Sequence, residues 1–512
     1  MSDLGDRIEA ERRVLSTLLV SEFAYKDLPG DFAPDWFEML EHRDLFKKFR
    51  TVIVEPGRPS DIVVLTETHS ALAVLIADVT QDAFHYDGDL RKHAEQLKDH
   101  KTVPQVDAIE TQFPPLSIDT LQEILGMTIK RDEENRLVTF LVMLSAYTSD
   151  NQINLSFNAP SAAGKSYIAT EIAKLFPSED MSMIGYCSPT AFFHDASKFD
   201  EERKVYRVDL ERKILVFLDQ PHQQLLERLR PLLSHDKREL RLKITDRSKR
   251  GEHRTKNIIL RGFPAVVFAT AGLQLDEQEA TRFLLLSPET SQEKIRDAVD
   301  VKISRETDAS AYSDWIENDP RRSTLKARIA SIKLAHIESI TIEKPDMVRK
   351  LFLTENKILK PRHSRDIGRI IGLIKSLALL NLWYRKRDGA TITASEDDIT
   401  DAFKVWQVIG KPQELSLPPF VYSVYFEVIL PAYKEKNTST LGETNFGLSR
   451  RDILTAYHDT YGRPMADGTL RKEVLPMLES SGLVSIESDP ADKRRQLVFP
   501  TFSDHLGGMN HP

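Results

Sequence analysis

The sequence predicts a multidomain α/β protein: a helical bundle, an α/β core, a second helical region and a small terminal unit. Three observations support this prediction. Apolar residues recur at helical spacing before residue 100, strands alternate with helices from about 121 to 286, and two helices and a hairpin follow Leu448. A chain of 512 residues has room for three or four domains of roughly 100–200 residues each.

The composition is that of an ordinary soluble globular protein, with 41% hydrophobic and 29% charged residues. Cys187 is the single cysteine, which excludes an internal disulfide framework and a cysteine-rich zinc site. The charged N-terminus lacks an apolar signal core, and the apolar stretch 137–147 is too short to span a bilayer. We therefore expect a cytoplasmic protein without membrane contact. The net charge of -8 does not indicate nucleic-acid binding by the whole surface.

The N-terminal part is expected to be helical, and a proline-containing segment without periodicity follows it. Helical spacing is clearest in two groups of residues: Leu15, Leu18 and Leu19, and then Leu45, Phe46 and Phe49. The predicted boundaries are 1–103 for the helical domain, 104–118 for a linker, 119–300 for the α/β core, 301–412 for a helical region, 413–446 for connecting helices and 447–503 for the terminal unit.

The strongest motif is a loop of small residues between a predicted strand, 153–157, and a helix. It consists of Ala159, Pro160, Ser161, Ala162, Ala163, Gly164, Lys165 and Ser166. Small residues let successive backbone N–H groups surround a phosphate, and the helix dipole favours an anion. The motif predicts a P-loop for ATP and Mg²⁺, in which Lys165 reaches the β- and γ-phosphates and Ser166 binds the metal ion. Ala159 stands where the general pattern has glycine.

A second strand supports this site. The apolar run 214–218 ends in Asp219, which is the Walker B pattern. A buried parallel strand carries such a carboxylate to the carboxyl edge of the sheet, where it meets the magnesium shell. Asp219 and Ser166 are therefore the predicted metal-binding residues.

A basic hairpin is predicted after this strand. Between Lys237 and Arg261, ten Lys or Arg residues stand against three acidic residues, so this segment has a net charge of +7. Two alternating strands flank its Ser-Lys-Arg-Gly turn. A cationic hairpin of this kind can bind a phosphate backbone without reading sequence. The candidate DNA-binding residues are Lys243, Arg247, Lys249, Arg250, Arg254 and Lys256.

These elements in this order resemble the core of MCM-type AAA+ motors over roughly residues 120–412. The resemblance implies an AAA+ α/β core with a helical lid, in a hexameric ring that hydrolyses ATP between subunits and moves along DNA. It makes the basic hairpin the pre-sensor hairpin of the central channel. It also makes Thr270 the polar tip of the sensor 1 strand and Arg282 an arginine finger for the neighbouring subunit's ATP.

The same resemblance makes Arg365 the first lid arginine and Arg369 the second. These motors usually carry glutamate after the Walker B aspartate, whereas this chain has Gln220. A neutral amide can orient a water but cannot act as a base, so Glu227 and His222 stay open as alternatives. The predicted catalytic residues are Lys165, Asp219, Gln220, Thr270, Arg282 and Arg365.

The two ends resemble other modules. Segments 8–19, 42–46 and 59–63 are similar to the N-terminal domain of the replicative helicase DnaB, which implies primase as a partner of residues 1–103. The C-terminal order of helix, helix and hairpin is the winged-helix layout, in which MCM-type chains often end. Its basic residues suit protein contacts as well as DNA: Arg471, Lys472, Arg494 and Arg495.

The leading interpretation is an ATP-dependent helicase or initiator-helicase for DNA replication, of a mobile element, phage or plasmid. One alternative is an AAA+ loader or initiator that does not unwind DNA. Another is a regulatory or defence protein in which ATP acts only as a switch, and Gln220 keeps this alternative open. Translocation polarity, origin sequence and strand preference do not follow from the sequence.

Overall fold

The structure is a computed structural model, and it divides the chain into two compact units, Met1–Gln112 and Phe113–Pro512. In the first unit, the Glu11 carboxylate and His42 Nδ1 are buried and lie 2.8 Å apart. Most of the predicted domain 1–103, including Leu19 and Phe49, lies outside the described residues. Those that the structure describes are Glu11, Arg13, Val14, Leu15, Leu18, His42, Leu45, Phe46, 113–160, 163–188, 198–200, 203, 205–246, 254–270, 281–438, 446–490 and 492–501.

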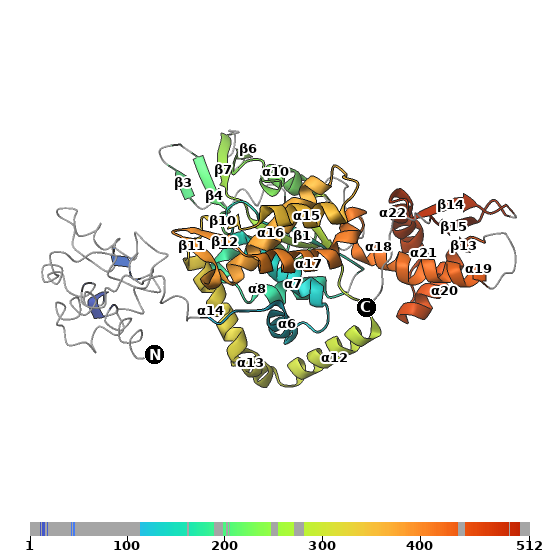
Figure 1. The fold of residues 1–512 in the computed structure, drawn as a ribbon, viewed down its shortest axis with the longest axis horizontal. Helices are drawn as coiled ribbons and strands as arrows, with labels where there is room; N and C mark the ends of the chain where they lie inside the picture. The colour runs from blue at the N-terminus through green and yellow to red at the C-terminus, as the bar shows by residue number, and fades with distance from the viewer. Residues whose placement is uncertain are drawn as a thin grey trace. The chain divides into compact units, whose positions relative to one another are not determined.

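The centre of the second unit is a parallel sheet of five strands in the order β2-β5-β8-β1-β9 (Figure 1). Its inner strands are buried along their whole length, as is usual for parallel strands covered on both faces. The first strand begins at Leu155 instead of Ile153, because Ile153 N donates to Ser145 Oγ. The strands are β1 (Leu155–Asn158), β2 (Met181–Ile184), β5 (Ile214–Phe217), β8 (Ala265–Thr270) and β9 (Leu284–Leu286).

Helices cover this sheet. Alternate residues of β5 and β8 pack on the leucines of α10, whereas α7 and α8 contact β8. The buried residues of α7 occupy nearly every position, so α7 is a core helix. The helices are α6 (Ile118–Gly126), α7 (Glu133–Leu144), η6 (Ser145–Tyr147), α8 (Lys165–Ala173), η7 (Ser178–Asp180) and α10 (Gln223–Leu233).

The predicted basic hairpin is present as two antiparallel strands, β6 (Glu239–Asp246) and β7 (Arg254–Arg261). It belongs to a second sheet of order β3-β4-β7-β6, with β3 (Lys198–Asp200) and β4 (Val205–Asp209), which the sequence pattern did not reveal. Short polar strands such as Lys198–Asp200 carry no clear apolar alternation, and only their pairing in the fold defines them.

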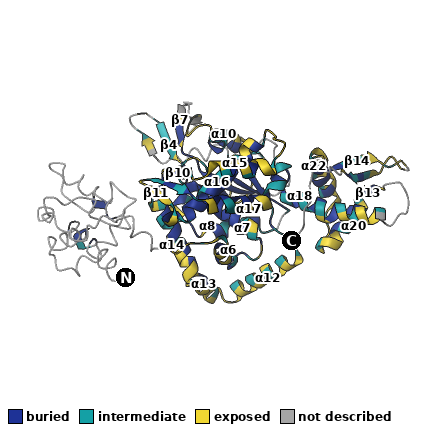
Figure 2. Cartoon of the chain, in the orientation of Figure 1, coloured by how far each residue is buried: buried dark blue, intermediate teal, exposed yellow. Residues whose placement is uncertain are grey.

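The region predicted as wholly helical, 301–412, also contains a small sheet of order β10-β12-β11. Gly389 and Ala390 turn the chain between β11 and β12, with Gly389 at φ 57°, and Ile340 and Ile392 are buried on one face. The elements are α12 (Gln292–Thr307), α13 (Ala309–Glu317), α14 (Pro320–Leu334), β10 (Ser339–Ile342), α15 (Pro345–Glu355), α16 (His363–Leu380), η8 (Leu382–Tyr384), β11 (Lys386–Asp388), β12 (Thr391–Ala394) and α17 (Glu396–Glu414). Figure 2 shows α12 and α13 as the most exposed helices of this region, and α12 has no buried residue.

The C-terminal segment has the predicted order of helix, helix and hairpin, and its helices share one core with α18 and η9. Ser449 and Asp452 form a capping box, which explains why α20 begins at Arg450. The elements are α18 (Pro419–Ser423), η9 (Val424–Ile429), α19 (Leu430–Thr438), β13 (Leu448–Ser449), α20 (Arg450–Tyr461), α21 (Asp467–Thr469), η10 (Leu470–Val474), α22 (Leu475–Ser480), β14 (Val484–Ser488) and β15 (Gln496–Pro500).

Among the described helices, none is by itself long and apolar enough to cross a bilayer. One bent pair, Glu396–Glu414 with Pro419–Asn437, passes by length and composition together, with an angle of 81° between its halves.

Candidate functional site

The loop after β1 has the geometry of an anion site at a helix start. Gly164 adopts φ 88°, a left-handed conformation that favours glycine, and α8 begins at the next residue. The start of a helix offers unpaired N–H groups and a partial positive charge. Ala159 is fully buried, so the methyl group in place of the usual glycine hydrogen points into the protein. Ser161 and Ala162 lie outside the described residues.

Lys165 closes this loop. Its Nζ donates to Ala159 O at 2.5 Å and to Pro160 O at 2.9 Å, and the side chain is buried. Burial lowers the Lys165 pKa from 10.5, and the charge of Asp219 opposes this effect. An ammonium group held by carbonyl oxygens in the mouth of the loop is partly desolvated, and a phosphate is the anion that would fit it.

Two neighbouring strands end beside the loop. Ser166 Oγ donates to Leu218 O at 3.2 Å, which places it next to the end of β5. Asp219 follows as an exposed residue, and its Oδ1 accepts from Gln220 N at 2.8 Å. Thr270, at the end of β8, is fully buried and lies opposite Asn158 in the register of β1 and β8. The predicted residues at this edge therefore come from three adjacent strand ends.

The two alternatives for a base lie on α10. His222 caps this helix, and its Nδ1 accepts from Gln224 N at 3.2 Å, so the ring has a structural role. Glu227 is exposed on the same helix. Asn158 was not singled out by the sequence pattern, yet its Nδ2 is buried without a hydrogen-bond partner within the described residues. This amide at the tip of β1 is a further polar group at the site.

The described residues contain no group of three or more His, Cys, Asp and Glu side chains that could hold a metal ion. Mg²⁺ that binds together with a nucleotide does not require such a group. Mg²⁺ keeps several waters and binds one or two protein ligands together with substrate phosphates. Ser166 and Asp219 are such a pair, so the residues fit Mg²⁺ that arrives with a nucleotide.

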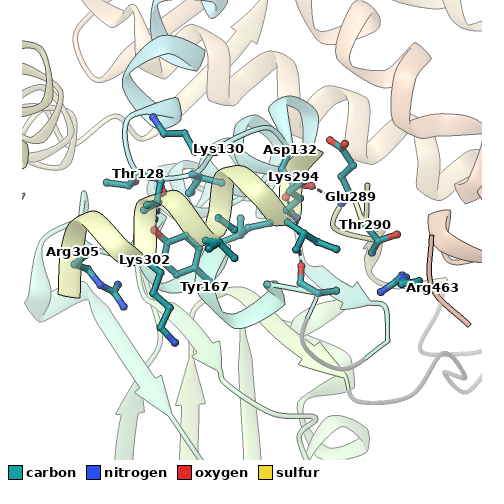
Figure 3. A pocket seen from close by; sticks show the side chains of 18 residues that line it. Thr128, Lys130, Asp132, Tyr167, Glu289, Thr290, Lys294, Lys302, Arg305 and Arg463 are labelled. Atoms are coloured by element: carbon teal, nitrogen blue, oxygen red, sulfur yellow. Dashed lines mark hydrogen bonds and ion pairs between the residues drawn. The ribbon is translucent and has the colours of Figure 1, made fainter. Parts of the chain in front are cut away.

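A pocket of about 380 Å³ opens beside the loop, between α8 and α12 (Figure 3). Tyr167 lies on its wall, with its hydroxyl donating to Thr128 O at 2.8 Å. Lys294 bridges the wall and the loop, because its Nζ pairs with Asp132 and lies 3.4 Å from Ala163 O. The lining residues used below are Gly164, Tyr167, Ile168, Thr290, Ile295 and Arg463.

This pocket was not predicted from the sequence. One signal is visible in retrospect: Ile295, Val299 and Ile303 recur every four residues along α12, yet all three are exposed. An exposed apolar stripe on a helix beside the loop 159–166 is suited to an apolar part of a ligand.

The predicted arginines lie at the opposite edge of the sheet. Arg282 precedes β9, which runs parallel to β1, and its Nε donates to Ser234 Oγ at 2.9 Å. Arg365 is exposed at the start of α16 and donates to the Thr281 hydroxyl. Both residues line a pocket of about 410 Å³ at the amino end of β1. Because β1 has four residues, it separates the two edges by about 13 Å.

Arg369, predicted as a second lid arginine, is buried and fully engaged in structural contacts. It pairs with Asp366 at 3.0 Å and donates to Thr281 O at 2.8 Å and Phe283 O at 2.9 Å. Burial lowers the Arg369 pKa to about 10, and the neighbouring Asp366 charge opposes this shift. Arg369 therefore holds the backbone on both sides of Arg282.

The basic hairpin is only partly described. Lys243 is exposed on β6, opposite Asn257 of β7. Arg254 and Lys256 lie on β7, and the structure describes only their backbone. Arg247, Lys249 and Arg250, in the turn, lie outside the described residues.

At the base of this hairpin, part of the +7 charge counted from the sequence is neutralised. Arg238 and Arg261 pair with Glu211, and Arg241 pairs with Glu239 at 3.7 Å. Glu211 lies outside the counted segment, which is why the count missed it. From Lys243 to Lys256, six basic residues stand against two acidic ones, so the sequence gives this part of the hairpin a net charge of +4.

No family model matches the chain, and no curated protein matches it. A solved structure of a full-length MCM homolog from Methanopyrus kandleri is 12% identical, with a TM-score of 0.36, over 60% of this chain and 62% of that one. This chain thus spans less than two thirds of that protein. A candidate ATPase from Cytophaga hutchinsonii is 12% identical, with a TM-score of 0.28, over 58% of this chain and 86% of that one. Both TM-scores are below 0.5, so neither likeness supports an inference about function.

Proposed function

We propose that the chain is an AAA+ ATPase of the MCM-like type, which binds ATP with Mg²⁺ at the carboxyl edge of its central sheet. The observation that carries this proposal is the convergence of Lys165, Ser166, Asp219 and Thr270 on one edge, beside a helix start. Lys165 contacts the β- and γ-phosphates, and Ser166 and Asp219 hold the metal ion. Mg²⁺ would supply charge neutralisation on the phosphate oxygens.

Hydrolysis requires a second copy of the chain. Arg282 and Arg365 lie at the amino edge, about one strand length of roughly 13 Å from the loop that contains Lys165. An arginine that stabilises charge on the γ-phosphate must touch it, so these two residues act on the nucleotide of a neighbouring subunit. We therefore propose a homo-oligomer, a hexameric ring by resemblance, in which one subunit supplies Lys165 and the next supplies the arginines.

Gln220 and Thr270 complete the chemistry at the carboxyl edge. The Gln220 amide can orient the attacking water by hydrogen bonds, although it cannot remove its proton. The Thr270 hydroxyl is the matching group on β8, in register with Asn158. Neither residue is charged, so the site depends on Lys165, the metal ion and the neighbour's arginines for electrostatic stabilisation.

DNA is the proposed polymer on which the motor acts. The half of the β6–β7 hairpin toward its turn contains six basic residues, Lys243, Arg247, Lys249, Arg250, Arg254 and Lys256. Six such hairpins would form a cationic ring for a phosphate backbone, with affinity that falls as salt rises. We propose an ATP-dependent DNA helicase or initiator-helicase for replication, with primase as a partner through residues 1–103 and the C-terminal unit as a winged helix.

The test uses the full-length chain with forked DNA. Wild-type protein is expected to hydrolyse ATP faster with DNA present and to displace the annealed strand, whereas Lys165→Ala should lose hydrolysis and displacement by more than about 100-fold. Circular dichroism and native mass spectrometry check that the variant keeps its fold and assembly. A Lys165→Ala variant with wild-type turnover, or a wild-type protein that stays monomeric with ATP and DNA, would remove the proposal.

One observation favours a second function. Gln220 replaces the acid that such motors usually carry, which suits a protein that binds ATP as a switch and turns it over slowly. DNA binding that depends on ATP, without hydrolysis or strand displacement, would establish this alternative. ATP hydrolysis with DNA binding but no strand displacement would instead indicate a loader or initiator.

A further inference from the structure

Arg463 brings the C-terminal segment into the pocket beside the P-loop. It follows α20 and the left-handed Gly462, and it lines the pocket together with Gly164, Thr290 and Lys294. Figure 3 shows Arg463 at the same end of the pocket as Thr290, whereas Lys302 and Arg305 lie at the other end. One element of this pocket therefore comes from the chain's last 60 or so residues rather than from the α/β core.

The guanidinium of Arg463 has unused hydrogen-bonding capacity. It forms a hydrogen bond with Tyr457, but its Nε and Nη2 atoms are buried without a partner within the described part of the chain. A buried donor without a partner costs free energy unless a ligand or water satisfies it. Nε and Nη2 form one edge of the planar fork and can donate side by side to two acceptors.

Two sets of contacts tie the C-terminal segment to the core, at the start of α12 and at the end of β1. Gln292 Nε2, at the start of α12, donates to Tyr461 O at 3.0 Å, and a Cβ on Gly462 would lie 3.1 Å from the same amide nitrogen. Ser287 Oγ donates to Asn158 O at 2.6 Å and accepts from Phe420 N at 2.9 Å. The second contact joins Asn158, at the end of β1, to Phe420 of α18 through the Ser287 hydroxyl, and α18 packs into the C-terminal core.

The two sides of the loop have different chemistry. Lys165 and Ser166 face the ends of β1 and β5, where the phosphates and metal ion are proposed to bind. Tyr167 and Ile168 face the pocket, together with Ile295 of α12. An aromatic and aliphatic wall suits the base and ribose of a nucleotide, whose phosphates lie on the other side of the loop.

We propose that Arg463 binds the nucleoside part of the nucleotide held by its own chain, with Nε and Nη2 donating to acceptors of the base or ribose. This inference rests on the proposed ATP site. Through this contact, the C-terminal segment becomes part of the nucleotide site, and nucleotide binding stabilises its packing against the core. Loss of nucleotide then loosens the ties at Tyr461 and Phe420, which couples the C-terminal unit to the ATPase cycle.

The experiment compares two ligands that share phosphates and differ in the nucleoside. Isothermal titration calorimetry measures Mg·ADP and Mg·pyrophosphate binding to the full-length wild type, Arg463→Ala, Arg463→Lys and the control Arg451→Ala, which removes an exposed arginine of α20. Arg463→Ala should weaken ADP about tenfold and leave pyrophosphate unchanged. Arg463→Lys should also weaken ADP, because an ammonium group lacks the two-donor edge. Arg451→Ala should match the wild type.

Hydrogen exchange gives a second readout that does not depend on affinity. ADP should slow exchange of backbone amides over 450–463 in the wild type, and this protection should disappear in Arg463→Ala at saturating ADP. ADP affinity of both Arg463 variants within twofold of the wild type would overturn the inference, and so would equal weakening of ADP and pyrophosphate. Lys165→Ala separates the two proposals: if it binds ADP like the wild type, the ATP site itself is wrong, whatever Arg463 does.

Discussion

The two edges of the central sheet differ in the charge that they present and in how that charge is held. The carboxyl edge has Lys165, with its ammonium group on loop carbonyls, and short neutral groups such as Ser166 and Thr270. The amino edge gathers arginines, of which Arg369 is buried in an ion pair and Arg365 is exposed. One edge is suited to receive a triphosphate, and the other is suited to stabilise charge on one that it does not itself hold.

This comparison is the basis for proposing that two copies of the chain share each nucleotide site. In a monomer, the loop lacks an arginine at the γ-phosphate, and the arginines face a pocket without a P-loop. Placing the amino edge of one subunit against the carboxyl edge of the next would bring the arginines of the first subunit to the loop of the second.

Arg282→Ala should lower ATP hydrolysis by about 10³-fold while leaving ADP affinity of the assembled protein close to that of the wild type. The reason is that Arg282 is proposed to contact the neighbour's nucleotide and not the one bound by its own chain. Mixing Arg282→Ala with Lys165→Ala subunits should restore part of the activity, because some seams then combine an intact loop with an intact arginine. Steady-state hydrolysis against mixing ratio measures this rescue, and a mixture with no activity above the sum of its parts would contradict action between subunits.

Arg369→Ala should lower the free energy of unfolding of the core by about 1–3 kcal/mol, because it leaves the Thr281 and Phe283 carbonyls without their donor, although Asp366 keeps its ion pair with Arg362. Arg365→Ala is the matched control on the same helix. Since Arg365 is exposed, its removal should change stability by less than about 0.5 kcal/mol while lowering hydrolysis. Urea denaturation of both variants measures the difference. Equal stability of the two would mean that Arg369 does not hold the backbone around Arg282.

Gln220→Ala should slow the single-turnover hydrolysis rate by about tenfold without changing ADP affinity, since the amide orients water and does not bind the phosphates. Gln220→Glu restores a general base and should be at least as fast as the wild type. If the alanine variant keeps the wild-type rate, Gln220 has no part in hydrolysis, and exposed Glu227 becomes the residue to replace next.

His235, at the amino edge, should make a small contribution to the pH dependence of stability. Burial lowers the His235 pKa from its ordinary 6.5, and nearby Asp150 and Asp236 oppose this effect. The unfolded chain therefore binds a proton that the folded chain does not, so stability falls as the pH drops through 6.5, by less than about 1.4 kcal/mol per pH unit. The control His235→Asn suits the residue's φ of 57° and should show a weaker fall between pH 7 and 5.5.

Features carried by local patterns could be predicted from the sequence. The loop 159–166, the strand that ends in Asp219 and the basic hairpin each depend on residues close together in the chain, and each element lies where its pattern indicated. The meeting of Asp219, Thr270 and Lys165 also followed, because parallel strands end at a common edge. The assignments of individual residues to catalysis and DNA binding stay predictions.

The roles of particular arginines depended on tertiary structure. In the sequence, Arg365 and Arg369 share one helix start, yet the fold buries one against Asp366, Thr281 and Phe283 and leaves the other exposed. Spacing along the chain places two residues on the same helix face, but it does not determine which of them is buried. Burial depends on the segment that packs against that face, and here this segment, around Thr281 and Phe283, lies about 85 residues earlier in the chain.

Hydrophobic periodicity and turn chemistry act over a few residues, so the sequence alone was enough to predict the strands β1, β5 and β8, the basic hairpin, the loop 159–166 and the residues at the carboxyl edge. Only the tertiary structure decided that the arginines face away from their own loop, that Glu211 neutralises the base of the hairpin, and that Arg463 reaches the pocket beside α8. These are contacts between segments far apart in the chain, and they are set by how whole elements pack, which no local pattern encodes.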